Sequence, residues 1–361
     1  MFVLDTTQEL LVTHLQETER IMNGLLRKKP YCGDATIVPN LDLGFPHDVI
    51  RLAGGFATGL YIKWNSLIPF VPVDICMNTC TVSFYELLDA NPSFFSEEAC
   101  LRLLRNLDNS CYTANFHRGN HFIGYMESVR TGKKYIVIHS SAAEFETTFN
   151  GLYPVEGNYI YENTRVYSSK GRYVRYIEGH AAELYQKVAS HLYVFNEDRH
   201  NFFVSALLGN EKKIVSESHY HHYGMPSPHE GLLGSHMVSR GQISPLLTRP
   251  GENIFLIRYA DCLYHNLCVE NMIITPHGLG KRHNGNAALR INAQKGLLKL
   301  DDIEYQIQYG ESLRAHPNLE LRSIALSDYF SFFSKVYEYE IVDEFKQLSS
   351  YSKAGFVKWH I

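Results

Sequence analysis

The sequence has no apolar run long enough to cross a membrane, and its charge is almost balanced. No stretch approaches about 18 consecutive apolar residues, so no membrane-spanning helix is expected. The formal net charge of −4 over 361 residues excludes a surface that is basic throughout. Any contact with nucleic acid must therefore depend on a local basic patch. Hydrophobic residues at 45% and charged residues at 20% exclude a disordered or fibrous chain.

Cysteine is scarce and irregularly placed. Seven Cys make an odd number without a regular framework, and a chain of this length does not need disulfide bonds for stability. The first twenty residues carry acidic side chains early and lack the apolar core of a secretory signal. We therefore expect a reduced, cytoplasmic protein.

Hydrophobic periodicity predicts a mixture of helices and strands. Apolar residues recur at helical spacing in four segments, 6–27, 96–107, 180–208 and 328–348. Short apolar runs with abrupt polar ends lie between them and are typical of strands, whereas 30–59 is punctuated by Gly and Pro and predicts turns. We see no internal repeat or linker and expect one domain of mixed α and β structure.

Histidine is unusually frequent, with 18 copies against seven Met and two Trp. It is the commonest metal ligand, although most single histidines are ordinary surface or hydrogen-bonded residues. Six residues share one context, at the polar end of a β-like run: Asp74, Cys76, His121, His139, His221 and His277. Imidazoles with one carboxylate and one thiolate suit Mn, Zn, Fe or Co rather than Mg or Ca. Cys76 and Cys80 have no second Cys pair at zinc-finger distance, so a structural zinc site is not expected.

A glycine-containing loop follows the last of these histidines, in the segment PHGLGKR. Gly278 and Gly280 allow the backbone to approach a phosphate, and Lys281 supplies positive charge for it. His277, at the entrance of the loop, would lie against that phosphate. The alternative is an ordinary glycine turn followed by a basic pair on the surface.

Taken in order, these segments resemble the RtcB family of RNA ligases from about residue 38 to residue 361. VPNLDLG resembles the family's M-P-D-x-H-x-G, and the stretch ending in PVDICMN resembles its V-G-x-D-I-G-C-G-M-N. RGNHFIGY is similar to G-G-G-N-H-F-I-E, YIVIHSS to a run ending in H-S/T-G-S-R, and ESHYHHYG stands at the family's H-N pair. SRGQISP resembles R-K-G-A-T-P-A, PHGLGKR resembles C-S-H-G-A-G-R, and AGFVKWHI is similar to a terminal strand ending in V-K-G.

The resemblance implies a fold and an activity. The fold would be a single RtcB-like α+β domain over 1–361, with an N-terminal helix in 1–30 and a catalytic core in 31–361 whose mixed sheets and flanking helices surround a metal cleft. Members of the family join an RNA 3′-phosphate, or 2′,3′-cyclic phosphate, to a 5′-hydroxyl in RNA splicing and repair. They do so through a histidine that GTP guanylates in the presence of Mn²⁺. The expected partners are thus RNA ends and a nucleotide, with no membrane, and the expected metal is Mn²⁺, with Zn²⁺ or Co²⁺ as alternatives.

The same resemblance implies roles for individual residues. His277 would be the guanylated histidine, which is covalent catalysis by an imidazole nitrogen. The residues implied to contact the nucleotide are Asn120, Gly278, Gly280, Lys281 and Lys358. The implied metal ligands are Asp74, Cys76, His121, His139 and His221.

The chain departs from the family's pattern around the metal cysteine and the base. Met77 occupies the position of the metal cysteine, so Cys76 serves as a ligand only through a two-residue deletion. Gly124 replaces a Glu that reads guanine, Leu326 replaces a Tyr that stacks on it, and His222 replaces an Asn. The phosphate and metal residues are thus retained while the base pocket is altered. We expect either a ligase with relaxed nucleotide choice or a non-ligating paralogue that binds metal and RNA ends or a protein partner. A metal-dependent hydrolase of phosphate esters is the third reading.

Overall fold

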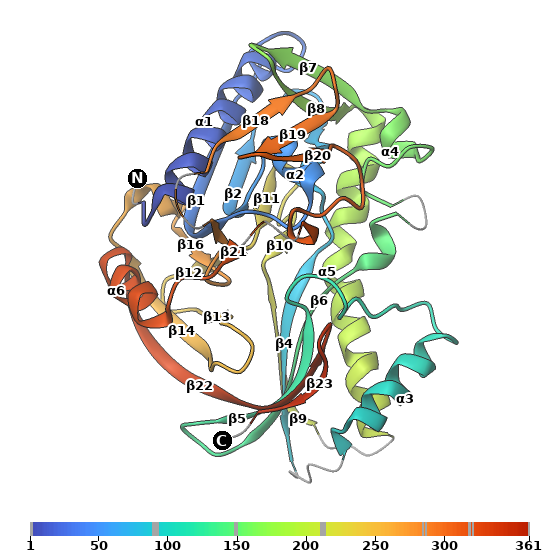
Figure 1. Ribbon diagram of the computed structural model, residues 1–361, viewed down its shortest axis with the longest axis vertical. Coiled ribbons are helices and arrows are strands. Elements are labelled where there is room, and N and C mark those ends of the chain that lie inside the picture. Colours follow the sequence, from blue (N-terminus) through green and yellow to red (C-terminus); the bar gives the residue numbers. More distant parts are fainter. Residues whose placement is uncertain are drawn as a thin grey trace.

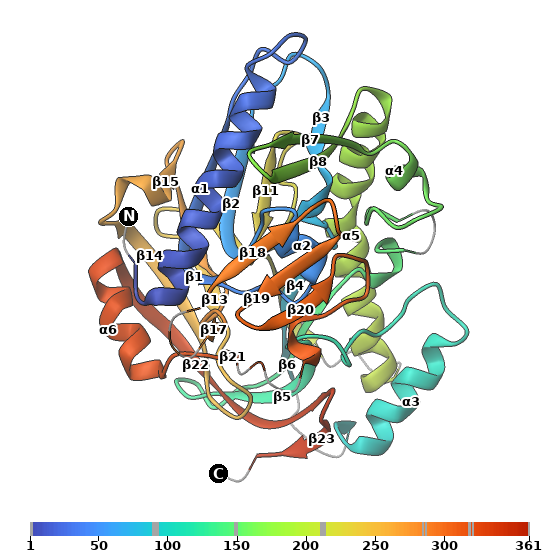
Figure 2. The ribbon, with the colours of Figure 1, turned by 45° about the horizontal axis from the view of Figure 1, so that its top comes forward.

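The computed structural model describes residues 3–88, 94–147, 151–209, 214–283, 285, 287–316, 319 and 321–359. Its main feature is an antiparallel sheet curled into a half-barrel, with a smaller antiparallel sheet above it in the view of Figure 1. Helices lie along the outside of both sheets in Figures 1 and 2. The mixed α+β class expected from the sequence is confirmed.

Three of the four predicted helical segments are helices. In the first, the Asp5 carboxylate accepts the amide of Gln8 at 2.9 Å, and in the second the Ser96 hydroxyl accepts the amide of Ala99 at 3.2 Å, so both helices begin at a side-chain cap. The helices are α1 (Thr6–Leu26), α2 (Val49–Ala53), α3 (Glu97–Leu107), α4 (Tyr159–Glu162), α5 (His180–Leu208) and α6 (Leu326–Val336), with 3-10 turns η1 (Val73–Ile75), η3 (Ala143–Phe145), η5 (His265–Leu267) and η6 (Leu313–Ala315). None of the helices in the described ranges is long and apolar enough to span a membrane.

The main sheet has the strand order β13-β14-β22-β5-β6-β4-β9, and β23 also pairs with β22. Register shifts in the pairing of β22 with β14 and with β5 mark bulges, which increase local twist and favour curling. Its strands are β4 (Cys80–Leu87), β5 (Phe122–Ser128), β6 (Lys134–Ser141), β9 (Ile214–His221), β13 (Ile243–Leu246), β14 (Ile254–Cys262), β22 (Tyr337–Ser352) and β23 (Gly355–Lys358).

The segment predicted as a helix over 328–348 is mostly strand. The helix α6 ends at Val336, and β22 runs on from Tyr337 to Ser352. The first residues of β22, YEYEIVDEF, alternate aromatic or β-branched side chains with acidic ones, a pattern that favours a half-buried strand. Pairing with β14 on one side and β5 on the other satisfies the backbone of this segment, so tertiary pairing overrides its helical propensity.

The smaller sheet has the order β1-β2-β11-β10 and packs against α1. Leu11 and Leu15 of α1 are buried in the same apolar core as Ile62 and Trp64 of the sheet, and removing this surface from water stabilises the pair. The remaining strands are β1 (Ala35–Gly44), β2 (Thr58–Trp64), β3 (Phe70–Pro72), β7 (Arg165–Ser169), β8 (Arg172–Glu178), β10 (Tyr223–Gly224), β11 (Glu230–Leu233), β12 (Ser235–Ser239), β15 (Cys268–Val269), β16 (Met272–Pro276), β17 (Arg282–His283), β18 (Leu289–Asn292), β19 (Leu297–Leu300), β20 (Ile303–Gln306) and β21 (Leu321–Arg322).

The helix α5 covers one face of the main sheet through buried polar contacts. The amide of Asn196 donates to the Thr81 hydroxyl at 2.7 Å, and the Ser140 hydroxyl lies 2.7 Å from the His200 Nε2. Successive side chains along a strand point to opposite faces. The neighbours of Thr81 and Ser140 therefore point away from α5, and this opposite face carries the candidate site.

Candidate metal centre

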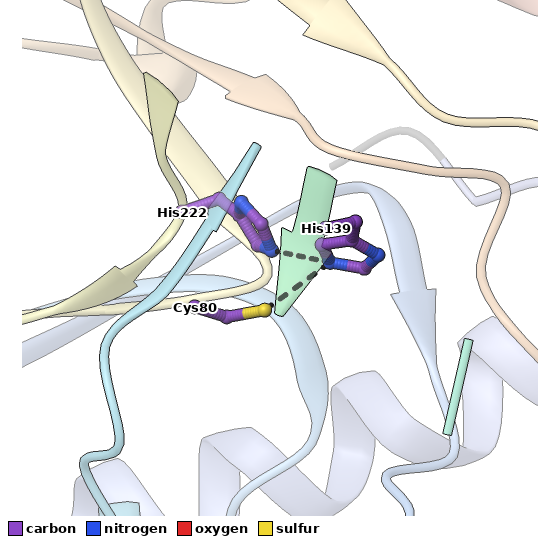
Figure 3. A group of neighbouring side chains, drawn as sticks. All are labelled: Cys80, His139 and His222. Carbon is purple, nitrogen blue, oxygen red and sulfur yellow. Dashed lines mark hydrogen bonds between the residues drawn. The ribbon is translucent and has the colours of Figure 1, made fainter. Parts of the chain in front are cut away.

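A thiol and two imidazoles meet on the face of the main sheet that points away from α5. Cys80 begins β4, His139 lies near the end of β6, and His222 directly follows β9. The Cys80 Sγ lies 3.2 Å from the His139 Nε2, which lies 3.1 Å from the His222 Nε2. Figure 3 shows these three atoms pointing toward one another. All three residues are buried, and the group could hold a metal ion.

Strand pairing brings the thiol and the first imidazole together from distant segments. In the antiparallel pair β4 and β6, Val82 lies opposite His139. Residues that face each other across a ladder share a side of the sheet, and so do residues two apart along a strand. Cys80, two residues before Val82, therefore lies on the same side as His139.

Backbone carbonyls orient two of the rings. The His139 Nδ1 lies 3.2 Å from the Asn120 carbonyl, and the His121 Nδ1 lies 3.3 Å from the Asn115 carbonyl. A carbonyl can only accept, so each Nδ1 carries a proton and each Nε2 presents its lone pair. The His121 Nε2 lies 3.4 Å from the Cys80 Sγ, so His121 stands beside the group of three.

Burial shifts the pKa values of these four side chains. It lowers the pKa of His121 to about 3, with the positive charge of Arg118 adding to the effect. Burial and the neighbouring imidazoles lower the pKa values of His139 and His222 well below the usual range. Burial also raises the pKa of the Cys80 thiol. The imidazoles are thus neutral near pH 7 and able to bind a cation, whose charge would in turn favour the thiolate.

A fourth histidine, His277, adjoins the group from the loop after β16. Its ring stacks on the ring of His222, with centroids 4.5 Å apart and planes 13° apart. Its Nδ1 contacts the carboxylate of Asp42 and lies 3.1 Å from the carbonyl oxygen of Gly234. Both neighbours are hydrogen-bond acceptors, so Nδ1 carries a proton, and neither contact occupies Nε2.

One cleft connects these rings with the glycine loop predicted from the sequence. Asn120, Gly278, Gly280 and Lys281, all expected to contact a nucleotide, line it together. The arginines that also line it are Arg51, Arg118, Arg249 and Arg314. Asp42 and Asp48 line the same cleft, and Asp48 pairs with Arg51 and Arg118. The cations still outnumber these carboxylates, and such an excess of positive charge beside a candidate metal group suits an anionic ligand.

Asp74 and Cys76 do not join the histidines, contrary to the prediction. The buried Asp74 carboxylate is held by Arg175, whose Nε lies 3.1 Å from both carboxylate oxygens. Cys76 packs in a separate buried cluster with Tyr153. The thiol of the group comes instead from Cys80, because β4 begins only there and places that side chain beside β6. The C-x₃-C spacing was the one sequence signal for it.

The structure also places His221, predicted as a ligand, outside the group of Cys80, His139 and His222. His221 lies opposite Thr81 and shares its side of the sheet, toward α5. Its Nδ1 lies 2.9 Å from the Thr81 hydroxyl and its Nε2 lies 2.8 Å from the Glu197 carboxylate. The adjacent His222, which points the other way, takes the position expected of His221.

Lys358, expected to contact the nucleotide, lies outside the cleft. It is an exposed residue of β23 and does not line the cleft in the described part of the chain. The next residue, Trp359, lies against Gly251. The prediction that Lys358 contacts a nucleotide in this cleft is therefore not supported by the structure.

Comparison with known proteins does not assign the chain to a family. No protein-family model matches the chain, and no curated protein matches it. The structure itself defines the class: a mixed α+β protein with a buried histidine and cysteine group that could hold a metal ion.

Proposed function

We propose that this protein is an RtcB-like nucleotidyl transferase that joins RNA ends, with His277 as the residue that carries the nucleotide. One arrangement carries the proposal. The Nδ1 of His277 contacts the Asp42 carboxylate, while its ring stacks on His222 of the candidate metal group. His277 is only 8% exposed and contacts a buried carboxylate, which is not expected of a histidine in an ordinary surface turn.

The pairing with Asp42 supports His277 as a nucleophile. The Gly234 carbonyl accepts the Nδ1 proton and so fixes the tautomer of the ring, and the adjacent Asp42 carboxylate would stabilise the positive charge that develops when Nε2 forms a bond.

The donor atoms fit a divalent transition metal. Cys80, His139 and His222 would hold it, with His121 beside them. A thiolate with imidazoles suits Zn²⁺ or Co²⁺ better than Mn²⁺, which prefers oxygen ligands, so we shift the expected metal toward the first two. When bound, such an ion would supply charge neutralisation for phosphate oxygens beside His277.

The proposed reaction has three displacements. First, the His277 Nε2 attacks the α-phosphorus of a nucleoside triphosphate such as GTP; a P–N bond forms, the bond to the bridging oxygen breaks, and pyrophosphate leaves. Second, an oxygen of an RNA 3′-phosphate attacks the same phosphorus, and His277 leaves as a neutral imidazole once Nε2 is free. Third, an RNA 5′-hydroxyl attacks the 3′-phosphate, loses its proton to solvent and displaces the nucleoside monophosphate. Positioning and charge stabilisation, rather than further acid–base groups, dominate such phosphoryl transfers.

A labelling experiment tests the proposal. The full chain is incubated with GTP or ATP labelled at the α-phosphate, with Mn²⁺, Zn²⁺ or Co²⁺ in turn, and then denatured. We expect a label that is stable to alkali and labile to acid, as a P–N bond is, and no label in His277→Ala. The matched control is His180→Ala, because the side chain of His180 is 83% exposed. Absence of label with every metal, or full labelling of His277→Ala, contradicts the proposal.

A non-ligating protein that binds metal and RNA ends is the second candidate. The observation that favours it is the engagement of Asp74 by Arg175, together with the position of Lys358 outside the cleft. These two residues were expected to serve the metal and the nucleotide. This candidate predicts that the chain retains RNA with a 3′-phosphate and binds metal, yet takes up no nucleotide label.

A further inference from the structure

The strand β9 forms one free edge of the main sheet. In the described part of the chain it pairs with β4 alone, with His219 opposite Ser83 (Figure 1). An edge strand presents a row of unpaired amides and carbonyls, which proteins usually protect with Lys, Pro or a covering segment. The sequence of β9, IVSESHYH, contains no Lys and no Pro. Its first four residues are exposed, among them the β-branched Ile214 and Val215. This edge is therefore open to another strand.

The pairing with β4 determines which backbone groups of β9 are free. The His222 amide donates to the Cys80 carbonyl at 3.1 Å. Hydrogen-bonded and non-hydrogen-bonded pairs alternate along an antiparallel ladder, so residues 218 and 220 also bond to β4. The amides and carbonyls of Glu217 and His219 therefore point outward from the sheet, and the described residues make no hydrogen bond to them. These groups are available to a strand that adds to the edge.

The half-barrel leaves room for another strand beside β9. The sheet order ends at β13 and β9, so the half-barrel is not closed between these two strands. His219 and His221 instead line a groove whose far side includes Gln242 and Ile243. The carbonyl of His221 is occupied, because the His236 Nδ1 lies 3.0 Å from it. An added strand must therefore pair with the part of β9 that precedes His221.

The side chains of this edge complement a second copy of the same strand. Two identical strands that pair antiparallel about a two-fold axis at residue 218 place Glu217 of each copy opposite His219 of the other. A carboxylate opposite an imidazole favours such a cross-strand pair, whereas like charges directly opposite destabilise it. An axis at residue 217 would place the two Glu217 carboxylates against each other. The axis at residue 218 is thus favoured.

Both side chains of the pair are placed to make this contact. They lie on the same side of the sheet, because they are two residues apart along the strand. Within one chain the Glu217 carboxylate lies 3.8 Å from the His219 Nε2, which is too long for a hydrogen bond, and the Glu217 side chain is 47% exposed. With the axis at residue 218, the outward amides and carbonyls of both residues also become reciprocal hydrogen-bond partners.

We propose that β9 is a dimerisation edge, at which two copies of this chain pair their β9 strands antiparallel about an axis at residue 218. The pairing joins the two half-barrel sheets into one continuous sheet. A contact of one short strand is small, so the dissociation constant is expected on the order of 1–100 μM. The dimer does not depend on the proposed function, because neither Glu217 nor His219 lines the cleft that contains His277.

Cross-linking of the full chain tests the position of the axis. Ser218→Cys places two thiols opposite each other in a non-hydrogen-bonded pair, whose Cα atoms lie about 4.5 Å apart, within the range that a disulfide bridges. With air and a copper–phenanthroline catalyst as the oxidant, we expect a dimer on a denaturing gel that dithiothreitol removes. Ser216→Cys is the matched control, because its two thiols would lie about 13 Å apart across the same axis. The parent chain shows any cross-linking by its native cysteines.

Sedimentation equilibrium at increasing protein concentration measures the association itself. We expect the parent chain to dimerise, and Glu217→Lys to weaken the dimer on the order of tenfold, because both carboxylate–imidazole pairs are lost. Glu183→Lys makes the same charge change on α5, where the side chain is 60% exposed, and should dimerise like the parent. Glu217→Pro removes an outward amide and should abolish the dimer, while the amides that pair with β4 remain.

Two kinds of result overturn the proposal. The first is a parent chain that stays monomeric at every concentration, as it would if this edge takes a strand from a different protein. The second is a dimer that persists unchanged in Glu217→Lys and Glu217→Pro, or that cross-links equally through Ser216→Cys and Ser218→Cys, because its contact lies elsewhere. If a Glu217 variant fails to fold by circular dichroism, the two cysteine variants decide. A failure of nucleotide labelling would remove the proposed function and leave the dimer standing.

Discussion

The imidazoles of His222 and His277 lie almost parallel in a stacked pair, with their centroids 4.5 Å apart. His222 belongs to the candidate metal group, and His277 has its Nδ1 against Asp42. The stack therefore joins the metal group to the histidine that we propose as nucleophile. Displacement of either ring would disturb both functions, since aromatic stacking geometry is set by close packing.

Metal content should distinguish His221, the last residue of β9, from His222, which directly follows it. We expect Cys80→Ser and His222→Ala each to weaken the affinity for Zn²⁺ or Co²⁺ by at least tenfold. Losses of this size are typical when a metal site loses one ligand or a group that supports a ligand. His221→Ala should retain the metal, because that ring contacts Thr81 and Glu197 on the other side of the sheet. Elemental analysis after dialysis measures the bound metal. Metal loss in His221→Ala alone would mean that His221, as expected from the sequence, is the ligand.

Asp74 should prove important for stability and not for the metal. Asp74→Ala removes a fully buried carboxylate and leaves the largely covered Arg175 guanidinium unpaired, which should cost about 3–5 kcal/mol of unfolding free energy. The double variant Asp74→Ala with Arg175→Met should have an unfolding free energy closer to that of the parent chain, because it no longer contains the unpaired charge of Arg175. Urea denaturation gives the energies, and elemental analysis should find unchanged metal. Loss of metal in a folded Asp74→Asn chain would contradict this role.

Stability should fall as the pH drops, in part because of His14. Its Nε2 lies 2.9 Å from the Leu52 carbonyl, and its Nδ1 lies 2.6 Å from the Arg172 guanidinium, which can only donate. Burial, aided by Arg172, lowers the pKa of His14 to about 3. The unfolded chain therefore binds this proton near pH 6.5 while the folded chain does not, and stability present above pH 6.5 is lost between there and pH 3.

Replacing His14 should remove that part of the pH dependence. His14→Gln should reduce the slope of unfolding free energy against pH by about 1.4 kcal/mol per unit over this window, the effect of one proton. His180→Gln, at an exposed position, should leave the slope unchanged. Denaturation at pH 7, 6 and 5 gives the unfolding free energies. If these energies fall with pH equally in the parent chain and in His14→Gln, His14 does not contribute to the pH dependence.

Nucleotide labelling should distinguish GTP from ATP only weakly. Gly124 lies within β5, where an added Cβ would meet Met126, and Leu326 begins α6; neither lines the cleft. Gly124 cannot supply the carboxylate that would read guanine, so the penalty that this carboxylate would impose on the wrong base is lost, and we expect a difference below about tenfold. Initial labelling rates with GTP and ATP measure it. A preference for GTP of a thousandfold would mean that other residues read guanine.

Local signals in the sequence were sufficient for much of the secondary structure. The helices predicted over 6–27, 96–107 and 180–208 match α1, α3 and α5 to within a residue or two, because amphipathic periodicity and caps such as Ser96 act within a few residues. The segment 328–348 failed because its acidic residues are compatible with a helix, and pairing with β14 and β5 decides otherwise.

The sequence by itself determined the kind of site: histidines at strand ends, followed by a glycine loop with a lysine. It identified His121, His139 and His277 among the residues that now line one cleft. Tertiary structure alone decided which neighbours join them. Cys80 rather than Cys76 faces the cleft because β4 begins only at Cys80 and places that side chain beside β6. His222 rather than His221 faces it because adjacent side chains of an extended segment point to opposite sides, and only the pairing of β9 with β4 fixes which side is which. The pairing of Asp74 with Arg175, about a hundred residues away, is equally a product of folding, because no local pattern links two such distant charges.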